Sequence, residues 1–247
     1  MMKIVSDLQQ AQFSEFIQSI PLQFDKGGSV IYKSRNEIRV FDVHGTTLNV
    51  KRFKTPLFFN RLIYTFFRPS KAQRSFQYAL KLKEMGIETP QPVAYILIKK
   101  GGLLHDSYYI SWQVDHNRNF YEFGEGGVKG REHILIAFAG FTADIHKKGV
   151  LHKDYSPGNI LFKEDDGAVT FCMVDINRLR FGDVPVHKGC LNFVRLWGQQ
   201  PFVEIIVRKY AEIRGADPEA CLMLVLRARK KFWKRFTRKR PLPFAPD

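Results

Sequence analysis

Cysteine is scarce in this chain and follows no metal-binding pattern. Only three cysteines occur among 247 residues, with neither a CxxC pair nor another metal-ligand spacing. An odd number cannot all pair within the chain, so the sequence favours reduced thiols and a cytoplasmic protein. The three are Cys172, Cys190 and Cys221.

Long apolar runs are also missing. No run reaches the ~18 apolar residues that a membrane-spanning helix needs. The N-terminus carries Asp7, Gln9 and Gln10 where a signal peptide would have its apolar core. We therefore expect a protein that is soluble or peripheral on a membrane.

Acidic residues are outnumbered. The chain has 39 lysines and arginines against 24 aspartates and glutamates, a formal net charge of +15. Such a field attracts anions, whether phosphorylated sugars, nucleic acid or acidic lipid, but does not determine the fold. With 45% hydrophobic residues, the chain can bury a core as one two-lobed unit or as two small domains.

The end of the chain concentrates this charge and interleaves it with apolar residues. A basic helix of this kind can lie on an anionic membrane, where each basic side chain contributes ~1 kcal/mol. Alternatively, its apolar side packs on the protein and its cations face water. Both interpretations stay open. The basic residues are Arg227, Arg229, Lys230, Lys231, Lys234, Arg235, Arg238, Lys239 and Arg240, and the apolar ones are Leu224, Leu226, Phe232, Trp233 and Phe236.

One run has the layout of a kinase catalytic loop. It reads HKDYSPGN over residues 152–159, and Asp175 follows a second apolar segment. Phosphoryl transfer needs a carboxylate near the attacking hydroxyl, an amide oxygen on one Mg²⁺ and a second carboxylate on the metal ions. We predict Asp154 and Asn159 as catalytic residues and Asn159 and Asp175 as ligands of Mg²⁺ and, through it, of the nucleotide. The alternative is a chance HxD sequence with an aspartate that merely ends a strand.

The surroundings of this run favour the functional interpretation. Residues 160–162 and 169–174 are predicted strands around a polar turn, which would return Asp175 beside Asp154. We expect His152 to fix the loop backbone rather than to act as an acid or base. His146, near the end of a predicted helix over 131–148, is expected to be structural and suited to the helix dipole.

The N-terminal half predicts an antiparallel sheet. After a helix over 7–20 that Pro21 ends, the β-branched and aromatic runs 30–32, 38–43 and 47–53 read as a meander. Kinases carry a phosphate-binding lysine on the third strand of such a sheet. Lys51 is the candidate and Lys54 the rival, because strand period places Lys51 on the face opposite Val50.

A two-lobed boundary follows from the remaining elements. A helix over 70–85, which Ser70 can cap, is followed by strands over 93–98 and 108–114. We predict an α+β protein-kinase-like fold of two lobes. The N-lobe, 1–114, would contain an N-terminal helix and a nucleotide-binding antiparallel sheet of about five strands with one main helix. The C-lobe, 115–247, would be mostly helical and contain the catalytic loop and the basic C-terminal helix. The glycine-rich, polar segment 115–130 is the predicted crossover.

These motifs resemble those of a named family. HKDYSPGN, VDIN at 174–177, RSF at 74–76 and GIETPQPVAYI at 86–96 resemble the lipopolysaccharide core kinases, the Kdo and heptose kinases of Gram-negative bacteria and relatives of eukaryotic-type protein kinases. The resemblance covers about 30–197. It implies ATP-dependent, Mg²⁺-assisted phosphorylation of an inner-core sugar hydroxyl on a lipid A precursor, at the cytoplasmic face of the inner membrane.

The resemblance also assigns roles. Asp154 would orient or deprotonate the sugar hydroxyl, Asn159 and Asp175 would hold Mg²⁺, and Lys51 would bind the phosphates of ATP. The expected partners are the lipopolysaccharide core or lipid A precursor and, through the basic C-terminus, the anionic inner membrane. Nucleic acid is not an expected partner.

Two features depart from the kinase pattern. The helix after the third strand carries Ser75 where a glutamate would pair with the lysine, and Gln77 and Glu84 are imperfect substitutes. The predicted phosphate loop at 33–36 is short and basic and contains no glycine. Gly27 and Gly28 lie before this loop in the sequence.

Other departures bear on the substrate class. Ser156 stands where serine/threonine protein kinases usually have lysine, no APE follows Asp175, and the remaining C-terminal part is short. A small or lipid-linked acceptor fits these features. An aminoglycoside-type kinase, a protein kinase and a weakly active pseudokinase that binds anions remain alternatives. Arg178, Arg180, Lys188 and Arg195 could offer charge to an anionic acceptor, although each alone could simply be solvated.

Overall fold

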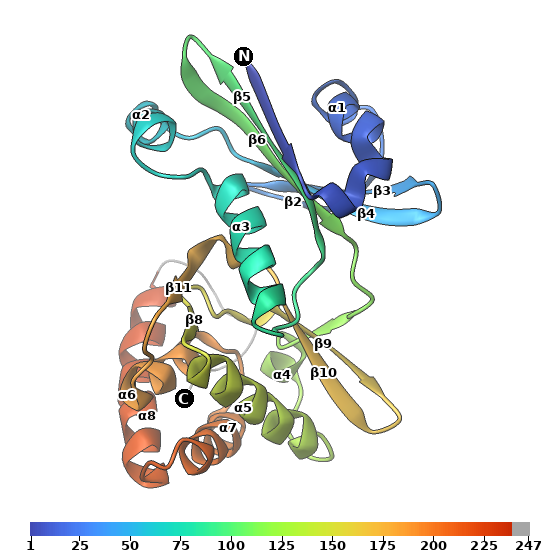
Figure 1. The fold of residues 1–247 in the computed structure, drawn as a ribbon. Helices are drawn as coiled ribbons and strands as arrows, with labels where there is room; N and C mark the ends of the chain where they lie inside the picture. The colour runs from blue at the N-terminus through green and yellow to red at the C-terminus, as the bar shows by residue number, and fades with distance from the viewer. Residues whose placement is uncertain (239–247) are drawn as a thin grey trace. The chain divides into compact units, whose positions relative to one another are not determined.

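The computed structural model describes residues 1–238 and divides the chain into two compact units (Figure 1). The N-terminal unit is Met1–Val114, and the C-terminal unit begins at Asp115. Of the predicted basic C-terminal helix, Lys239 and Arg240 lie outside the described residues.

A six-stranded antiparallel sheet forms the N-terminal unit, in the order β1-β5-β6-β4-β3-β2. The predicted strands are present, several of them longer than expected. The edge strand β1, which pairs with β5, was missed because it has only five residues, none of them buried, and so carries little periodic signal. The strands are β1 (Met2–Ser6), β2 (Ser29–Lys33), β3 (Glu37–Val43), β4 (Thr46–Phe53), β5 (Pro92–Lys100) and β6 (Leu103–Trp112).

Helices cover both faces of this sheet. On one face, η1 (Leu8–Phe13) and α1 (Ser14–Gln23) pack on a core that includes Leu48 and Val50 of β4. On the other, α3 (Lys71–Glu84) packs on a smaller cluster that includes Phe53. The alternation of β4 residues between the two clusters follows from the period of two in a strand.

The ends of two helices were predicted with different success. Ser70 caps α3 as expected, because its side chain accepts a hydrogen bond from the amide of Gln73 at 3.1 Å. The predicted end of the first helix at Pro21 is wrong, since α1 continues through this proline to Gln23. Proline removes only one hydrogen bond there, and burial of Ile20 against the sheet holds the turn in place.

A further helix, α2 (Phe58–Phe66), was not predicted. It contains no buried residue. No capping side chain marks its start, since Leu57 occupies the N-cap position, and its nine residues are few for a periodic pattern.

The C-terminal unit is mainly helical and holds two small sheets, of order β10-β9-β7 and β11-β8. Its core is an aromatic cluster around Phe120, whose ring centroid lies 4.2 Å from that of Phe138. The predicted crossover therefore contains structure of its own. The elements are β7 (Arg118–Asn119), α4 (Glu122–Glu125), α5 (Glu132–Lys147), β8 (Val150–His152), η2 (Pro157–Asn159), β9 (Ile160–Asp165), β10 (Ala168–Met173), η3 (Ile176–Arg178), β11 (Leu179–Phe181), α6 (Val186–Cys190), η4 (Leu191–Arg195), α7 (Gln200–Ile213) and α8 (Pro218–Phe236).

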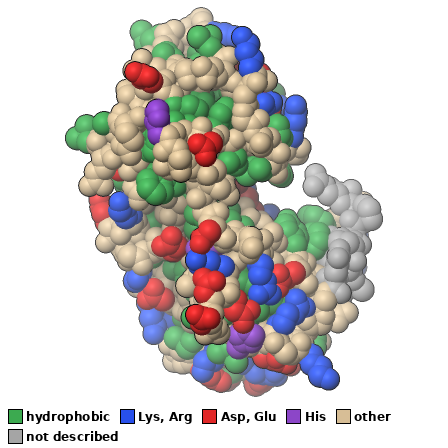
Figure 2. All heavy atoms as spheres, turned by 90° about the vertical axis from the view of Figure 1, so that its right-hand side faces the viewer, with side chains coloured by type: hydrophobic (Ala, Val, Ile, Leu, Met, Phe, Trp, Pro, Cys, Tyr) green, Lys and Arg blue, Asp and Glu red, His purple; other side chains and the backbone are tan. Residues whose placement is uncertain are grey.

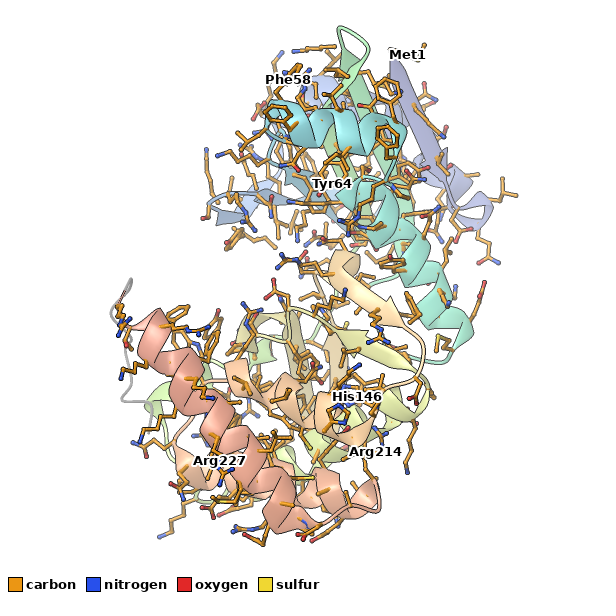
Figure 3. All side chains as sticks on the ribbon, turned by 90° about the vertical axis from the view of Figure 1, so that its left-hand side faces the viewer. Met1, Phe58, Tyr64, His146, Arg214 and Arg227 are labelled. Carbon is orange, nitrogen blue, oxygen red and sulfur yellow. The ribbon has the colours of Figure 1, made fainter. Side chains whose placement is uncertain are left out.

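The basic helix α8 packs on the rest of this unit. Val225 and Trp233 are buried, and the buried Arg229 donates hydrogen bonds to the carbonyl oxygens of Leu196 and Gly198, each at 2.7 Å. The packing interpretation thus holds for Trp233. The exposed cations of α8 form a separate face, on which Figure 3 shows Arg227.

Surface charge in the C-terminal unit is not segregated everywhere. Around β9 and β10, Figure 2 shows acidic and basic side chains interspersed, in line with ion pairs such as Lys163 with Asp115 at 2.7 Å.

Within residues 1–238, no helix combines the length and apolarity needed to cross a membrane. The three cysteines are free and buried.

Candidate active site

The predicted catalytic loop joins β8 to the hairpin β9–β10. Its start is fixed by pairing of β8 with β11, in which His152 lies opposite Leu179. Immediately beyond, the amide of Lys153 donates to the carbonyl of Arg178 at 3.1 Å. The segment after Asp175 therefore lies beside the start of the loop, as the predicted hairpin required.

His152 holds two parts of this loop together. Its Nδ1 accepts a hydrogen bond from the amide of Asp154 at 3.1 Å, and its Nε2 lies 3.2 Å from the carbonyl oxygen of Val174. Because Nδ1 accepts, Nε2 carries the proton and donates. Complete burial lowers the pKa of His152, so that the ring is neutral. The scaffold function expected from the sequence agrees with these contacts.

Hydrogen bonds join the chain segments that carry the three predicted polar residues. Asn159 donates from Nδ2 to the carbonyl of Asp154 at 2.8 Å, and the carbonyl of Asn159 accepts from the amide of Val174 at 3.0 Å. Asp175 follows directly, and its carboxylate accepts from Nδ2 of Asn177. The C-terminal unit thus brings Asp154, Asn159 and Asp175 together.

Asp175 has an unusual backbone conformation. Its φ of 53° and ψ of 40° lie in the left-handed region, which residues other than glycine rarely adopt. Such conformations require about 1–3 kcal/mol and tend to persist at functional sites. This strain, directly after β10, favours a functional carboxylate over an aspartate that merely ends a strand.

The carboxylate of Asp154 is bound by two arginines. Oδ2 accepts from Nη1 of Arg178 at 2.8 Å, and Oδ1 accepts from Nη1 of Arg195 at 2.6 Å. Both arginines remain substantially exposed, at 56% and 41% of their side-chain surface. Their free edges can therefore reach an anion next to Asp154. The sequence named these arginines but could not show that both contact the predicted catalytic carboxylate.

His146 is structural, as expected, but the suggested dipole interaction is wrong. Its Nδ1 lies 2.8 Å from the hydroxyl of Tyr210, and the ring is buried. Burial, helped by the nearby Arg214 (Figure 3), lowers the pKa of His146 to about 3. A neutral ring has no charge to offer the C-terminal end of α5.

Lys51 lies in the N-terminal unit on the α3 side of the sheet. It pairs with Tyr109 of β6, and its Nζ lies 5.2 Å from the ring centroid of Phe53. Both aromatic residues belong to the cluster under α3. Lys54 is exposed and follows the last residue of β4. This geometry agrees with the strand-period argument that preferred Lys51.

The two departures from the kinase pattern have structural counterparts. Ser75 is buried in α3, whereas Gln77 and Glu84 are exposed. Gly27 and Gly28 pack against Phe41. A Cβ at Gly28 would lie 2.8 Å from its ring, so this packing requires glycine there. They are therefore not assigned to a phosphate loop.

The oxygen donors present suit Mg²⁺. Among residues 1–238, no group of three or more His, Cys, Asp or Glu side chains could by itself hold a metal ion. Mg²⁺ in phosphoryl-transfer enzymes does not need such a group of side chains, since it takes one or two protein ligands together with phosphate oxygens and water. Asn159 uses its amide nitrogen to bind Asp154, which leaves the amide oxygen out of that bond. Asn159 and Asp175 fit such a mixed site.

The antiparallel sheet of the N-terminal unit and the mainly helical C-terminal unit have protein-kinase-like architecture, which by itself does not establish an activity. The model of the Lipopolysaccharide kinase (Kdo/WaaP) family matches residues 32–188. The chain belongs to this family.

A solved structure shares this fold. The structure of WaaP in complex with acyl carrier protein has a TM-score of 0.63 at 16% identity, over 94% of this chain and 99% of that one. The Mycobacterium tuberculosis PknI kinase domain gives a TM-score of 0.44 at 14% identity, over 82% of this chain and 93% of that one. Comparison with curated protein sequences returns no match.

Proposed function

We propose that this kinase transfers the γ-phosphoryl group of ATP to a sugar hydroxyl of the lipopolysaccharide inner core, Kdo or heptose, on a lipid A precursor. Family membership supports a lipopolysaccharide kinase. The observation that carries the finer proposal is the carboxylate of Asp154 flanked by Arg178 and Arg195. These cations beside the predicted base suit an acceptor that already bears phosphate.

Asp154 positions the acceptor hydroxyl and accepts its proton as the hydroxyl oxygen bonds to the γ-phosphorus and the bond from that phosphorus to the bridging oxygen breaks, with ADP as the leaving group. A carboxylate offers about four lone-pair sites, and the two arginines occupy one on each oxygen. The hydroxyl can therefore bind without displacing either arginine. The network through His152 and Asn159 fixes the backbone of Asp154, so that little reorganisation is needed.

ATP and Mg²⁺ complete the site in this proposal. Asn159 and Asp175 would hold Mg²⁺, which would supply positive charge to the phosphates of ATP. Lys51 binds the nucleotide phosphates from the sheet of the N-terminal unit. With Ser75 at the helix position, Lys51 is held by strand pairing and by the aromatic residues around it rather than by a glutamate of α3.

Location at the inner membrane follows from the acceptor. A lipid A precursor is anchored in the bilayer, so the enzyme would work at a membrane surface, which in this proposal is the cytoplasmic face of the inner membrane. The exposed cations of α8, among them Lys230 and Lys234, can contribute electrostatic attraction to anionic lipid.

Purified enzyme, labelled ATP and a panel of acceptors test the function. We expect transfer to Kdo-containing or heptose-containing lipid A acceptors, and loss of about 10²–10⁴ in kcat for Asp154→Asn, the range typical of a removed general base. Lys153→Gln, a change at the exposed neighbour, is the matched control. Transfer only to an aminoglycoside or a peptide, or to none of the acceptors, would count against the proposal.

A further inference from the structure

The helix α2 presents its apolar side to the solvent. Phe59 and Ile63 lie one turn apart, Phe66 a turn further on, and Phe67 follows the helix, which places most apolar side chains along one side. Phe59 is 77% exposed, Phe66 67% and Phe67 84%. Surface helices of globular proteins normally turn such a stripe toward the core. In α2 this orientation is reversed.

The polar side of α2 is the side attached to the protein. Arg61 donates from Nε to the carbonyl of Leu104 at 2.8 Å, and Thr65 accepts from the amide of Leu104 at 2.9 Å. Tyr64 lies toward α3 (Figure 3), where its ring is 5.8 Å from the guanidinium of Arg74. These contacts fix the rotation of the helix, so the outward apolar side is part of the fold and is not produced by a loose segment.

The surroundings of α2 are basic. Between Asp42 and Glu84 the sequence contains nine lysines and arginines and no acidic residue. Arg68, just after α2, is exposed, and so is Lys100, whose carbonyl accepts a hydrogen bond from Arg61 at 3.3 Å. An aromatic stripe bordered by cations matches the interface of an anionic bilayer, where rings enter the boundary between headgroups and acyl chains and cations bind the headgroups.

We propose that α2 is a membrane-docking helix that lies in the plane of an anionic bilayer and inserts Phe59, Phe66 and Phe67 into it. The charge around the stripe favours lipid over a second copy of this basic chain, which would be repelled. Docking would hold the enzyme beside a lipid-anchored acceptor. The purpose of docking therefore rests on the proposed function. The binding itself needs no phosphoryl transfer.

Vesicle co-sedimentation without any acceptor tests this docking. The probes are vesicles of phosphatidylethanolamine with phosphatidylglycerol, and vesicles of phosphatidylcholine alone. We expect the double variant F59S/F66S to bind the anionic vesicles about tenfold or more weakly, because two inserted rings are lost. The matched control is L8S/L22S, which removes two exposed leucines from η1 and α1 and should bind like the wild type. Asp154→Asn should also bind normally, which separates failure of docking from failure of the proposed function.

Insertion is tested at a single position. Phe66→Cys can be labelled selectively with an environment-sensitive dye, because the three native cysteines are buried. We expect its emission to rise on anionic vesicles and to be quenched by brominated acyl chains, whereas labelled Leu22→Cys should show neither effect. Three results would overturn the proposal: equal vesicle binding by the wild type and F59S/F66S, an unquenched dye at position 66, or a stripe that mediates only self-association or capture of an acidic protein such as acyl carrier protein.

Discussion

The two units hold their polar residues in different ways. In the C-terminal unit, Asp154 is tied to its surroundings through its amide and both carboxylate oxygens, and the buried His152 connects it to the strand before Asp175. In the N-terminal unit, Lys51 lies on a strand among aromatic side chains, and the apolar side of α2 faces the solvent. The fixed polar contacts of the candidate site thus lie in the C-terminal unit, whereas the N-terminal unit contributes Lys51 and the exposed apolar side of α2 to the proposals above.

Within the N-terminal unit, the largest effect on activity is expected at Lys51. Lys51→Met removes the charge that is proposed to bind the phosphates of ATP, an electrostatic contact worth about 10²–10³ in kcat/KM for ATP. Steady-state kinetics with varied ATP measure this loss. Lys54→Met, at the exposed rival position, should change kcat/KM less than about threefold, and an equal loss in both variants would remove the distinction between the two lysines.

The packing of the C-terminal unit can be tested by a substitution at Gly189. A Cβ at this position would lie 1.9 Å from the hydroxyl of Tyr210 and 2.8 Å from Nδ1 of His146. Gly189→Ala should lower the free energy of unfolding by about 2–3 kcal/mol, because it separates the buried pair. Urea denaturation measures the change. Gly140→Ala in α5, whose Cβ would meet nothing within 4 Å, should instead stabilise by up to about 1 kcal/mol.

The same pair predicts a pH dependence of stability. His146 has a pKa of about 3 in the folded protein, compared with 6.5 as its ordinary value. Between these values the unfolded chain binds a proton that the folded protein does not, so stability falls as the pH drops below 6.5. At pH 5 this group should have removed about 2 kcal/mol of the free energy of unfolding.

Urea unfolding of the wild type and of His146→Gln at pH 7 and pH 5 isolates this contribution. The variant lacks the titrating ring, so its stability should fall less over this interval. The buried His152, whose pKa is also lowered, remains in both proteins and cancels in the comparison. Parallel losses in the two proteins would show that His146 is not the group responsible.

The smallest effect concerns recognition of the acceptor. Arg195→Gln removes one cation beside Asp154, and we expect KM for a phosphorylated lipid A acceptor to rise about tenfold, the equivalent of one charge-assisted hydrogen bond. KM for ATP should change little. Arg180→Gln, at an exposed position of β11, is the matched control. A rise in KM for ATP, with no change in KM for the acceptor, would show that Arg195 contributes to binding of the nucleotide and not of the acceptor.

Local patterns predicted much of the fold and of the candidate site. Turn residues and short apolar runs located the loop and its hairpin, and strand period separated Lys51 from Lys54, because these features depend on neighbouring residues. The contacts of Asp154 with Arg178 and Arg195, at separations of 24 and 41 residues, depend on pairing of β8 with β11 and on helix packing. Composition carries no signal for such contacts.

The helix α2 shows a second limit of sequence patterns. Hydrophobic periodicity indicates that a helix has an apolar side, and the usual inference is that this side is buried. Here the hydrogen bonds of Arg61 and Thr65 attach the polar side. Such orientation is a tertiary property, because it depends on backbone groups of the β5–β6 hairpin.

Mass spectrometry of the core oligosaccharide from cells that lack this protein, complemented with the wild type or with Asp154→Asn, tests the proposed activity in the cell. We expect the wild type to restore a mass of about 80 units, one phosphoryl group, on an inner-core sugar, and the variant not to restore it. An unchanged phosphate content in all strains, or full restoration by the variant, would contradict the assignment of this chain as an Asp154-dependent kinase of the lipopolysaccharide core.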